Sequence, residues 1–190
     1  MTKNYIEEKK FDKIDFTEEP LGKGEYAHCT FTACNFANTD LSALIFSECE
    51  FKSCNLSMAK MKNTSLKEVK FIDCKLLGLN FEHCNEFLLS VYFENCNLNL
   101  SNFHKLPLKK TTFKNSSFHE ADFSDANLTG SLFDNCDLER AVFTNTTLEK
   151  ADLRTSYHYS IDPETNNIKK AKFSMTGIAG LLDQYDIEIE

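Results

Sequence analysis

Large apolar residues occur at every fifth position along most of this chain. They run without a miss from Phe11 to Phe81 and then, twelve residues later, from Phe93 to Leu153. A second register, two residues before each of these centres, holds mainly small or medium side chains such as Cys, Ala, Ser and Thr. A period of five fits neither the 3.6-residue turn of an amphipathic helix nor the alternation of a strand. The pattern therefore predicts a chain that turns every five residues and has two inward positions per repeat.

The other three positions of each repeat are mostly polar residues that favour turns and exposed sites. The large centres can fill the axis of a narrow tube, and the small register lets the backbone close around them. Repeats such as TFTACNFANTDLSALIF and NLTGSLFDNCDLERAVF resemble the pentapeptide-repeat family. The resemblance implies an all-β fold, a right-handed quadrilateral β-helix with four repeats per coil, over about residues 11–153. It also implies about seven coils and, at ~4.8 Å between strands, a rod about 34 Å long.

The step from Phe81 to Phe93 shifts the repeat by two positions within residues 82–92. Leu88 falls on the phase of the second run, so the sequence predicts that the new register already includes it. Two interpretations remain open: a kink between two half-rods, or a projecting loop that contacts a partner.

The five-residue pattern fades after Leu153, and residues 154–190 are expected to cover the last coil. Pro163 and its polar neighbours indicate turns. The end of the chain, MTGIAGLLDQYDIEIE, predicts one or two apolar helical turns followed by a short strand. Its apolar residues exceed what one coil end needs, and a free strand edge favours pairing, which together predict a two-fold dimer. Residues 1–190 are interpreted as a single domain.

Two segments, FKSCNLSMAKMKNTSLKEVKFIDCKLLGLNF and the tail GLLDQYDIEIE, resemble the Qnr group of quinolone-resistance proteins. The resemblance implies that a C-terminal helix and strand join two rods end to end. Such a dimer would mimic duplex DNA and bind DNA gyrase and topoisomerase IV. Better-known members carry long loops, whereas this chain has only the two-residue shift after Phe81. The residues implied at the dimer interface are Ile178, Leu181, Leu182, Tyr185, Ile187 and Ile189.

The charge of the chain bears on its partners. A net charge of −8 disfavours direct binding to nucleic acid and suits a basic partner. Residues 116–153 are mainly acidic and residues 52–75 mainly basic, which predicts a rod with one acidic and one basic end. Because centres twenty residues apart should stack, the acidic residues are expected to gather on two adjacent faces. Those expected to contact a partner are Glu120, Asp122, Asp125, Asp134, Asp137 and Glu139. The alternative is a solvated surface that only keeps the protein soluble.

No catalytic or metal site stands out in the sequence. All eight Cys, including Cys84 in the phase of the first run, lie two residues before a repeat centre and are expected to point inward as small fillers. Cys34, Cys54 and Cys74 should share one column, close enough to cross-link in principle, but a reducing cytosol argues against it. The five His are scattered, with no carboxylate at a convincing spacing, and are interpreted as surface residues. No enzyme activity, cofactor or metal is therefore expected.

The expected location is cytoplasmic, because the chain shows neither an export signal nor a stretch apolar enough for a membrane helix. Two functions remain open at this point. One is a DNA mimic that binds a type II topoisomerase and modulates it or protects it from quinolones. The other is a structural or adaptor scaffold that binds an unrelated protein. At single positions, Phe123 is expected to lie in the axis, and Asp137 to face water, so that Asp137→Asn leaves folding unchanged.

Overall fold

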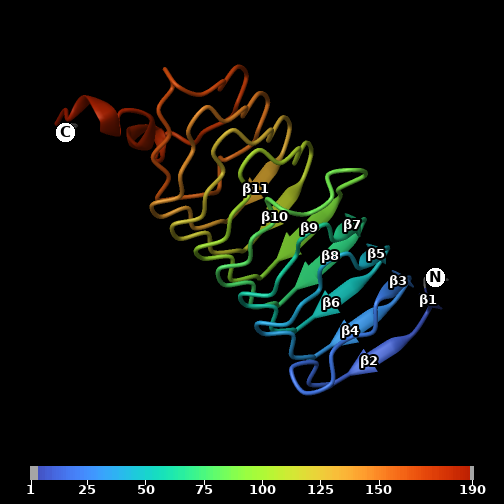
Figure 1. The fold of residues 1–190 in the computed structure, drawn as a ribbon. Coiled ribbons are helices and arrows are strands. Elements are labelled where there is room, and N and C mark those ends of the chain that lie inside the picture. The colour runs from blue at the N-terminus through green and yellow to red at the C-terminus, as the bar shows by residue number, and fades with distance from the viewer. Residues whose placement is uncertain (1–3, 189–190) are drawn as a thin grey trace.

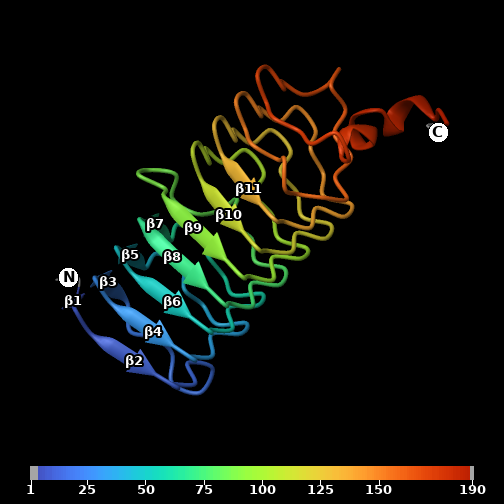
Figure 2. The same ribbon diagram turned by 180° about the vertical axis from the view of Figure 1, so that it is seen from behind.

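The chain winds into a rod of stacked coils, seen from two sides in Figures 1 and 2. The structure is a computed structural model that describes residues 4–188. Phe11 pairs with Phe31, Phe31 with Phe51 and Phe51 with Phe71, always between parallel strands. Because paired residues are twenty apart, one coil takes four repeats of five. The predicted all-β quadrilateral solenoid is confirmed.

Two neighbouring sides of the rod carry continuous strands. One side has the order β1-β3-β5-β7 and the next has β2-β4-β6-β8-β9-β10-β11. Isolated parallel bridges, such as Asp15 with Asn35 and Asp40 with Lys60, join the coils on the other sides, and the last bridge pairs Asp152 with Lys172. The strands are β1 (Asn4–Glu7), β2 (Lys10–Asp12), β3 (Gly24–Ala27), β4 (Thr30–Thr32), β5 (Ile45–Ser47), β6 (Glu50–Lys52), β7 (Ser65–Lys67), β8 (Val69–Ile72), β9 (Val91–Glu94), β10 (Thr112–Lys114) and β11 (Leu132–Asp134).

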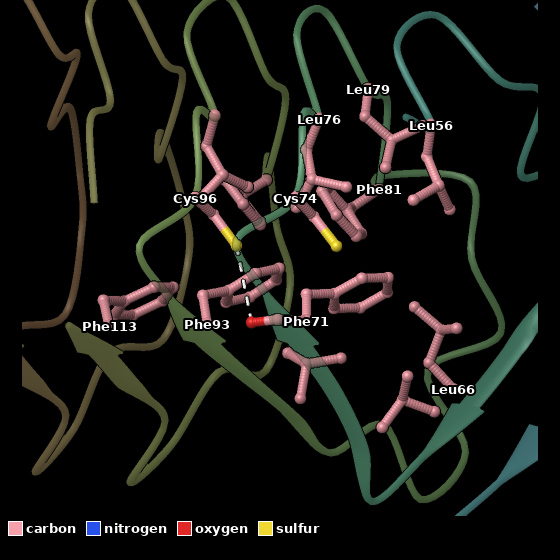
Figure 3. Packing of buried hydrophobic residues seen from close by; sticks show 14 of the residues in the cluster. Leu56, Leu66, Phe71, Cys74, Leu76, Leu79, Phe81, Phe93, Cys96 and Phe113 are labelled. Atoms are coloured by element: carbon pink, nitrogen blue, oxygen red, sulfur yellow. Dashed lines mark hydrogen bonds between the residues drawn. The ribbon is translucent and has the colours of Figure 1, made fainter. Parts of the chain in front are cut away.

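The repeat centres stack along the axis in columns. Phe71, Phe93 and Phe113 lie nearly parallel, with ring centroids 5.3 and 5.7 Å apart (Figure 3). The eight cysteines are all buried and free, and they belong to the same core cluster as the repeat centres. The Sγ of Cys96, for example, donates a weak hydrogen bond to the carbonyl oxygen of Phe71, at 3.4 Å (Figure 3). Both inward registers are therefore filled as the sequence predicts.

Corners of the rod lie two residues after the centres, where the backbone takes a positive φ. Ala33, two residues after Phe31, has a φ of 51°, and its N–H donates to the carbonyl oxygen of Lys52 one coil further on, at 2.8 Å. Most of these positions are not glycine, although the left-handed region disfavours other residues. The inter-coil hydrogen bond offsets that cost and points the side chain outward, so that corner residues form exposed columns.

The predicted register at the break is wrong for Leu88. Leu88 has a φ of 58° and is 62% exposed, so it occupies a corner position of the first register. Asn85 still pairs with Ser65, and the N–H of Ser90 donates to the carbonyl oxygen of Leu66, at 2.9 Å. The two extra residues therefore lie within 86–90, where the chain projects as the green loop before β9 (Figures 1 and 2). Leu89, one residue further on, packs against the core instead.

Two short 3-10 helices form the C-terminal cap, η1 (Ile178–Leu181) and η2 (Asp183–Tyr185). They confirm the predicted helical turns. The N–H of Ile161 donates to the carbonyl oxygen of Gly180, at 2.8 Å, and a Cβ at Gly180 would clash with the carbonyl oxygen of Tyr159. Only glycine therefore allows this close approach. Of the strand expected at 187–189, Ile187 lies outside any regular element and Ile189 lies outside the described residues.

Within residues 4–188, no helix is both long and apolar enough to cross a membrane.

Candidate partner-binding surface

Five of the six acidic residues expected to contact a partner lie on two adjacent sides of the C-terminal half. On one side, Asp137 belongs to a ladder of bridges that also contains Ser117, and the N–H of Glu120 donates to the carbonyl oxygen of Glu139, at 2.9 Å. Asp122 belongs to the ladder on the next side, and Asp125 follows it at the corner. Asp134 lies apart, in β11. We call the first five the acidic surface: Glu120, Asp122, Asp125, Asp137 and Glu139.

Asp137 lies between two histidines. Its Oδ2 is 2.7 Å from Nε2 of His119, and its Oδ1 is 2.9 Å from Nδ1 of His158. Glu139 approaches the other nitrogen of His119, at 3.9 Å. Burial raises the pKa of Asp137, but the hydrogen bonds from the two histidines outweigh it and hold the pKa below its ordinary value. With a side chain only 19% exposed, Asp137 does not face water freely, contrary to the expectation from the sequence.

His104 links two further carboxylates on the neighbouring side. Its Nδ1 is 3.0 Å from Oε1 of Glu82 and its Nε2 is 3.1 Å from Oδ2 of Asp125, so the three side chains span three coils. The hydrogen bond to Glu82 raises the pKa of His104, and the same bond lowers the pKa of Glu82. Part of the acidic surface is therefore already hydrogen-bonded to side chains of the same chain.

The prediction that the histidines lack carboxylate partners is wrong. His104, His119 and His158 each contact a carboxylate 18 to 22 residues away, which is about one coil. His28 likewise lies 3.5 Å from Glu48. In a solenoid of four five-residue repeats per coil, residues about twenty apart are neighbours. Searching for carboxylates 18 to 22 residues from each histidine would have found all of these pairs.

The remaining acidic residues are more exposed or lie elsewhere. Glu120 is 3.7 Å from Arg140, and both side chains are more than half exposed, so this ion pair contributes little to stability. Asp134 accepts a hydrogen bond from the hydroxyl of Thr155, at 3.0 Å, on the side away from Asp122.

The division into a basic and an acidic end that the sequence predicts does not hold on every part of the rod's surface. At the corner between the two stranded sides, the order is reversed. The N-terminal half of this corner carries Glu8, Glu48 and Glu68, whereas the C-terminal half carries Lys110, Lys150 and Lys170. The sequence-based division averages over all sides of the rod and hides this column.

The residues implied at the dimer interface differ in exposure. Ile178, Tyr185 and Ile187 are 41, 48 and 55% exposed. Leu181 is 8% exposed and packs in the core of its own chain, and Leu182 is half-buried. Ile189 lies outside the described residues. The cap thus offers three exposed apolar side chains to a partner.

Several surface hollows lie beside the coils of the described chain. One of about 420 Å³ lies beside the projecting loop, between Glu48, Glu68 and Leu89. Another of about 260 Å³ lies beneath the cap, at Tyr159. Among residues 4–188, no group of three or more His, Cys, Asp or Glu side chains is arranged to hold a metal ion.

The fold and surface define a parallel β-solenoid with a five-residue repeat and rows of outward side chains. The model of the pentapeptide repeat region matches residues 25–86 and 87–158, which is more than half of the chain. This chain belongs to the pentapeptide-repeat family. The two matched segments meet inside the projecting loop.

Solved structures of QnrB1, described as a plasmid-mediated fluoroquinolone resistance protein, share this fold. One trypsin-treated variant superposes with a TM-score of 0.67 at 22% identity, over 98% of this chain and 92% of that one. A second trypsin-treated variant gives a TM-score of 0.59 at 21% identity, over 98% of this chain and all of that one. No curated protein sequence matches this chain.

Proposed function

We propose that this chain is a non-enzymatic, protein-binding solenoid that mimics duplex DNA and binds a type II topoisomerase, DNA gyrase or topoisomerase IV. The observation that carries the proposal is the acidic surface, a two-sided array of carboxylates on a straight, rigid rod. Neighbouring coils space these carboxylates by ~4.8 Å along the axis. A basic groove that normally holds DNA phosphates is electrostatically complementary to such an array. The fold shared with QnrB1 supports the choice of partner.

The proposed assembly is a two-fold dimer through the cap. Ile178, Tyr185 and Ile187 are the exposed apolar residues that would bury against a second copy. Because the acidic surface lies in the half of the rod next to the cap, the dimer would bring two acidic surfaces together. Length and charge would then both resemble a duplex.

A gyrase supercoiling assay, with and without a quinolone, tests the partner. The wild-type chain should bind gyrase at micromolar concentration and change either supercoiling or its inhibition by the drug. The triple variant Glu120→Lys, Asp125→Lys, Glu139→Lys should bind at least tenfold more weakly. A matched control changes the exposed Glu7, Glu18 and Glu19 to Lys, with the same net charge, and should bind like the wild type.

The second candidate function is a structural or adaptor scaffold for an unrelated protein. The pairing of Asp137, Asp125 and Glu82 with histidines favours it, because carboxylates that already have hydrogen-bond partners in the chain are less available to a basic groove. If the chain at micromolar concentration neither binds gyrase nor changes supercoiling, the DNA-mimic function is wrong and the scaffold function is favoured.

Sedimentation at tens of micromolar tests the cap dimer. Ile178→Lys together with Ile187→Lys should abolish the end-to-end association without unfolding the rod. Met175→Lys is the control, because Met175 is 87% exposed and lies outside both cap helices. If the wild type stays monomeric, or if it associates as strongly as the Ile178→Lys, Ile187→Lys variant, the proposed cap dimer is wrong.

A further inference from the structure

One corner of the rod forms a column of outward side chains, interrupted at the projecting loop, that neither the cap nor the acidic surface includes. It runs where the β1–β7 side meets the β2–β11 side. Each member has a positive φ, and members on either side of the projecting loop stack through hydrogen bonds such as Glu48 N–H to the Lys67 carbonyl, at 2.8 Å, and Lys110 N–H to the Thr129 carbonyl, at 3.0 Å. At the loop Val69 pairs with Val91, so Leu88 projects between the two halves of the column. We call it the Leu88 column: Glu8, His28, Glu48, Glu68, Leu88, Lys110, Gly130, Lys150 and Lys170.

The charge of the Leu88 column reverses at its midpoint. Every charged member before Leu88 is acidic, and every charged member after it is basic, with His28 and Gly130 as the remaining positions. All six charged side chains belong to exposed residues. Within the described chain, only Glu48 and Lys150 have oppositely charged or histidine neighbours within 4 Å, namely His28 and Glu149. Most of this charge is therefore available to a partner.

Apolar side chains mark the midpoint. Phe87 and Leu88 belong to the projecting loop and are 68 and 62% exposed. The hollow of about 420 Å³ lies directly beside them and is bordered by Leu89 and by Glu68 of the column. A protruding apolar pair next to a hollow, which Leu88 itself helps to line, is a feature of surfaces that meet another macromolecule.

We propose that the Leu88 column binds a second copy of this chain, side by side and antiparallel, with a two-fold axis at the projecting loop. Only a partner whose charge reverses in the opposite sense complements both halves of the column. An antiparallel copy provides that order. Its basic half lies against the acidic half of the first copy, and its acidic half lies against the basic half of the first copy. A polyanion such as DNA would be attracted by one half and repelled by the other.

The apolar loop and the charges have different roles in this contact. The loop of each copy lies near the axis, so Phe87 and Leu88 of one copy face the hollow of the other. Their burial supplies affinity, whereas the exposed ion pairs select the antiparallel orientation and weaken in salt. Nine coil positions at ~4.8 Å give a contact strip roughly 40 Å long. The cap lies at the end of the rod and plays no part in it.

Complementary charge reversal tests whether the two charged halves of the column carry the contact. One variant changes Glu8, Glu48 and Glu68 to Lys, and the other changes Lys110, Lys150 and Lys170 to Glu. Both carry Ile178→Lys and Ile187→Lys, so that end-to-end association does not contribute. In sedimentation velocity at low salt, each variant alone should associate at least tenfold more weakly than the cap variant without reversals. An equimolar mixture of the two should restore association, and failure of the mixture to do so would overturn the proposal.

Two matched leucines test the midpoint. Leu88→Asn keeps a residue type that tolerates positive φ and should weaken lateral association at least tenfold. Leu100→Asn is the control, because Leu100 has a φ of 59° and is 56% exposed at another corner. Equal effects of the two changes would contradict the proposed contact. A different result would point to a polyanion as the partner instead of a second copy. In that case the chain would not self-associate, and it would bind a labelled DNA duplex in a way that depends on Lys110, Lys150 and Lys170.

Discussion

Phe123 shows what one centre contributes to the rod. Its ring is fully buried and stacks between Phe103, at 4.9 Å, and Phe143, at 5.2 Å. Phe123→Asp should unfold the neighbouring coils, since an unpaired carboxylate replaces the ring at a cost of more than about 3 kcal/mol. Phe123→Leu, the volume control, should cost only about 1 kcal/mol. Circular dichroism melts measure both, and a Phe123→Asp variant that melts like the wild type would contradict the inward register.

Asp137 holds two histidines on adjoining coils, so Asp137→Asn should destabilise the fold by about 1 kcal/mol at pH 6. The pKa of this carboxyl is lowered in the folded chain from its ordinary 3.8, so its contribution is present above that value and is lost as the pH falls through the folded pKa. Urea denaturation at pH 6 and pH 3 should therefore show the difference from the wild type shrinking in acid. Glu120→Gln, at a side chain 54% exposed, should change neither. A difference that grows in acid would refute this role of Asp137.

The projecting loop exists at a point where the repeat would bury a charge. Deleting Phe87 and Leu88 would restore the period of five and place Glu86 over Leu66, at an inward centre. That deletion should lower the melting temperature sharply, because the carboxylate has no partner there. Adding Glu86→Leu to the deletion should recover most of the loss and give an uninterrupted solenoid. Glu86→Leu alone, at an exposed position of the intact loop, should have little effect and serves as the control.

The sequence predicts the elements of this fold unevenly, for physical reasons. A strict period of five determines which side chains point inward, because no other backbone geometry repeats with it. The position of Leu88 relative to the five-residue repeat does not determine which register it follows, since a corner tolerates leucine. The informative residue is Glu86, because a carboxylate is unsuited to an inward centre. The tail DIEIE alternates like a strand, but a strand needs a partner edge, and alternation alone does not supply one.

Burial of the thiols is a property of the whole rod, because the cysteines line the rod from Cys29 to Cys136. Burial raises the pKa of Cys49, Cys84 and Cys136 to about 12. An aromatic disulfide reagent at pH 8 should leave the native thiols unmodified and react with all eight after denaturation. Since unfolded thiols ionise first, stability should fall as the pH rises above their ordinary 9.0. Rapid reaction of several thiols in the native protein would count against this packing.

Charge at the scale of the molecule is distributed around the rod as well as along it. Histidine partners, the acidic surface and the Leu88 column are visible only when residues about twenty apart are treated as neighbours. A linear reading of composition locates acidic residues 116–153 but not the side each one occupies. The repeat centres, by contrast, can be predicted without knowing which side of the rod they occupy, because every side needs a large apolar side chain pointing to the axis.

Pairing between residues one coil apart also governs how the rod comes apart. Hydrogen bonds between coils connect residues only about twenty positions apart, which corresponds to a relative contact order of about 0.1, in the range of fast-folding helical bundles. Within the described chain, β1 and β2 have a neighbour on one side only, whereas the opposite end is closed by η1 and η2. Within the described chain, local unfolding should therefore begin at the coil of β1 and β2 and proceed one coil at a time toward the cap.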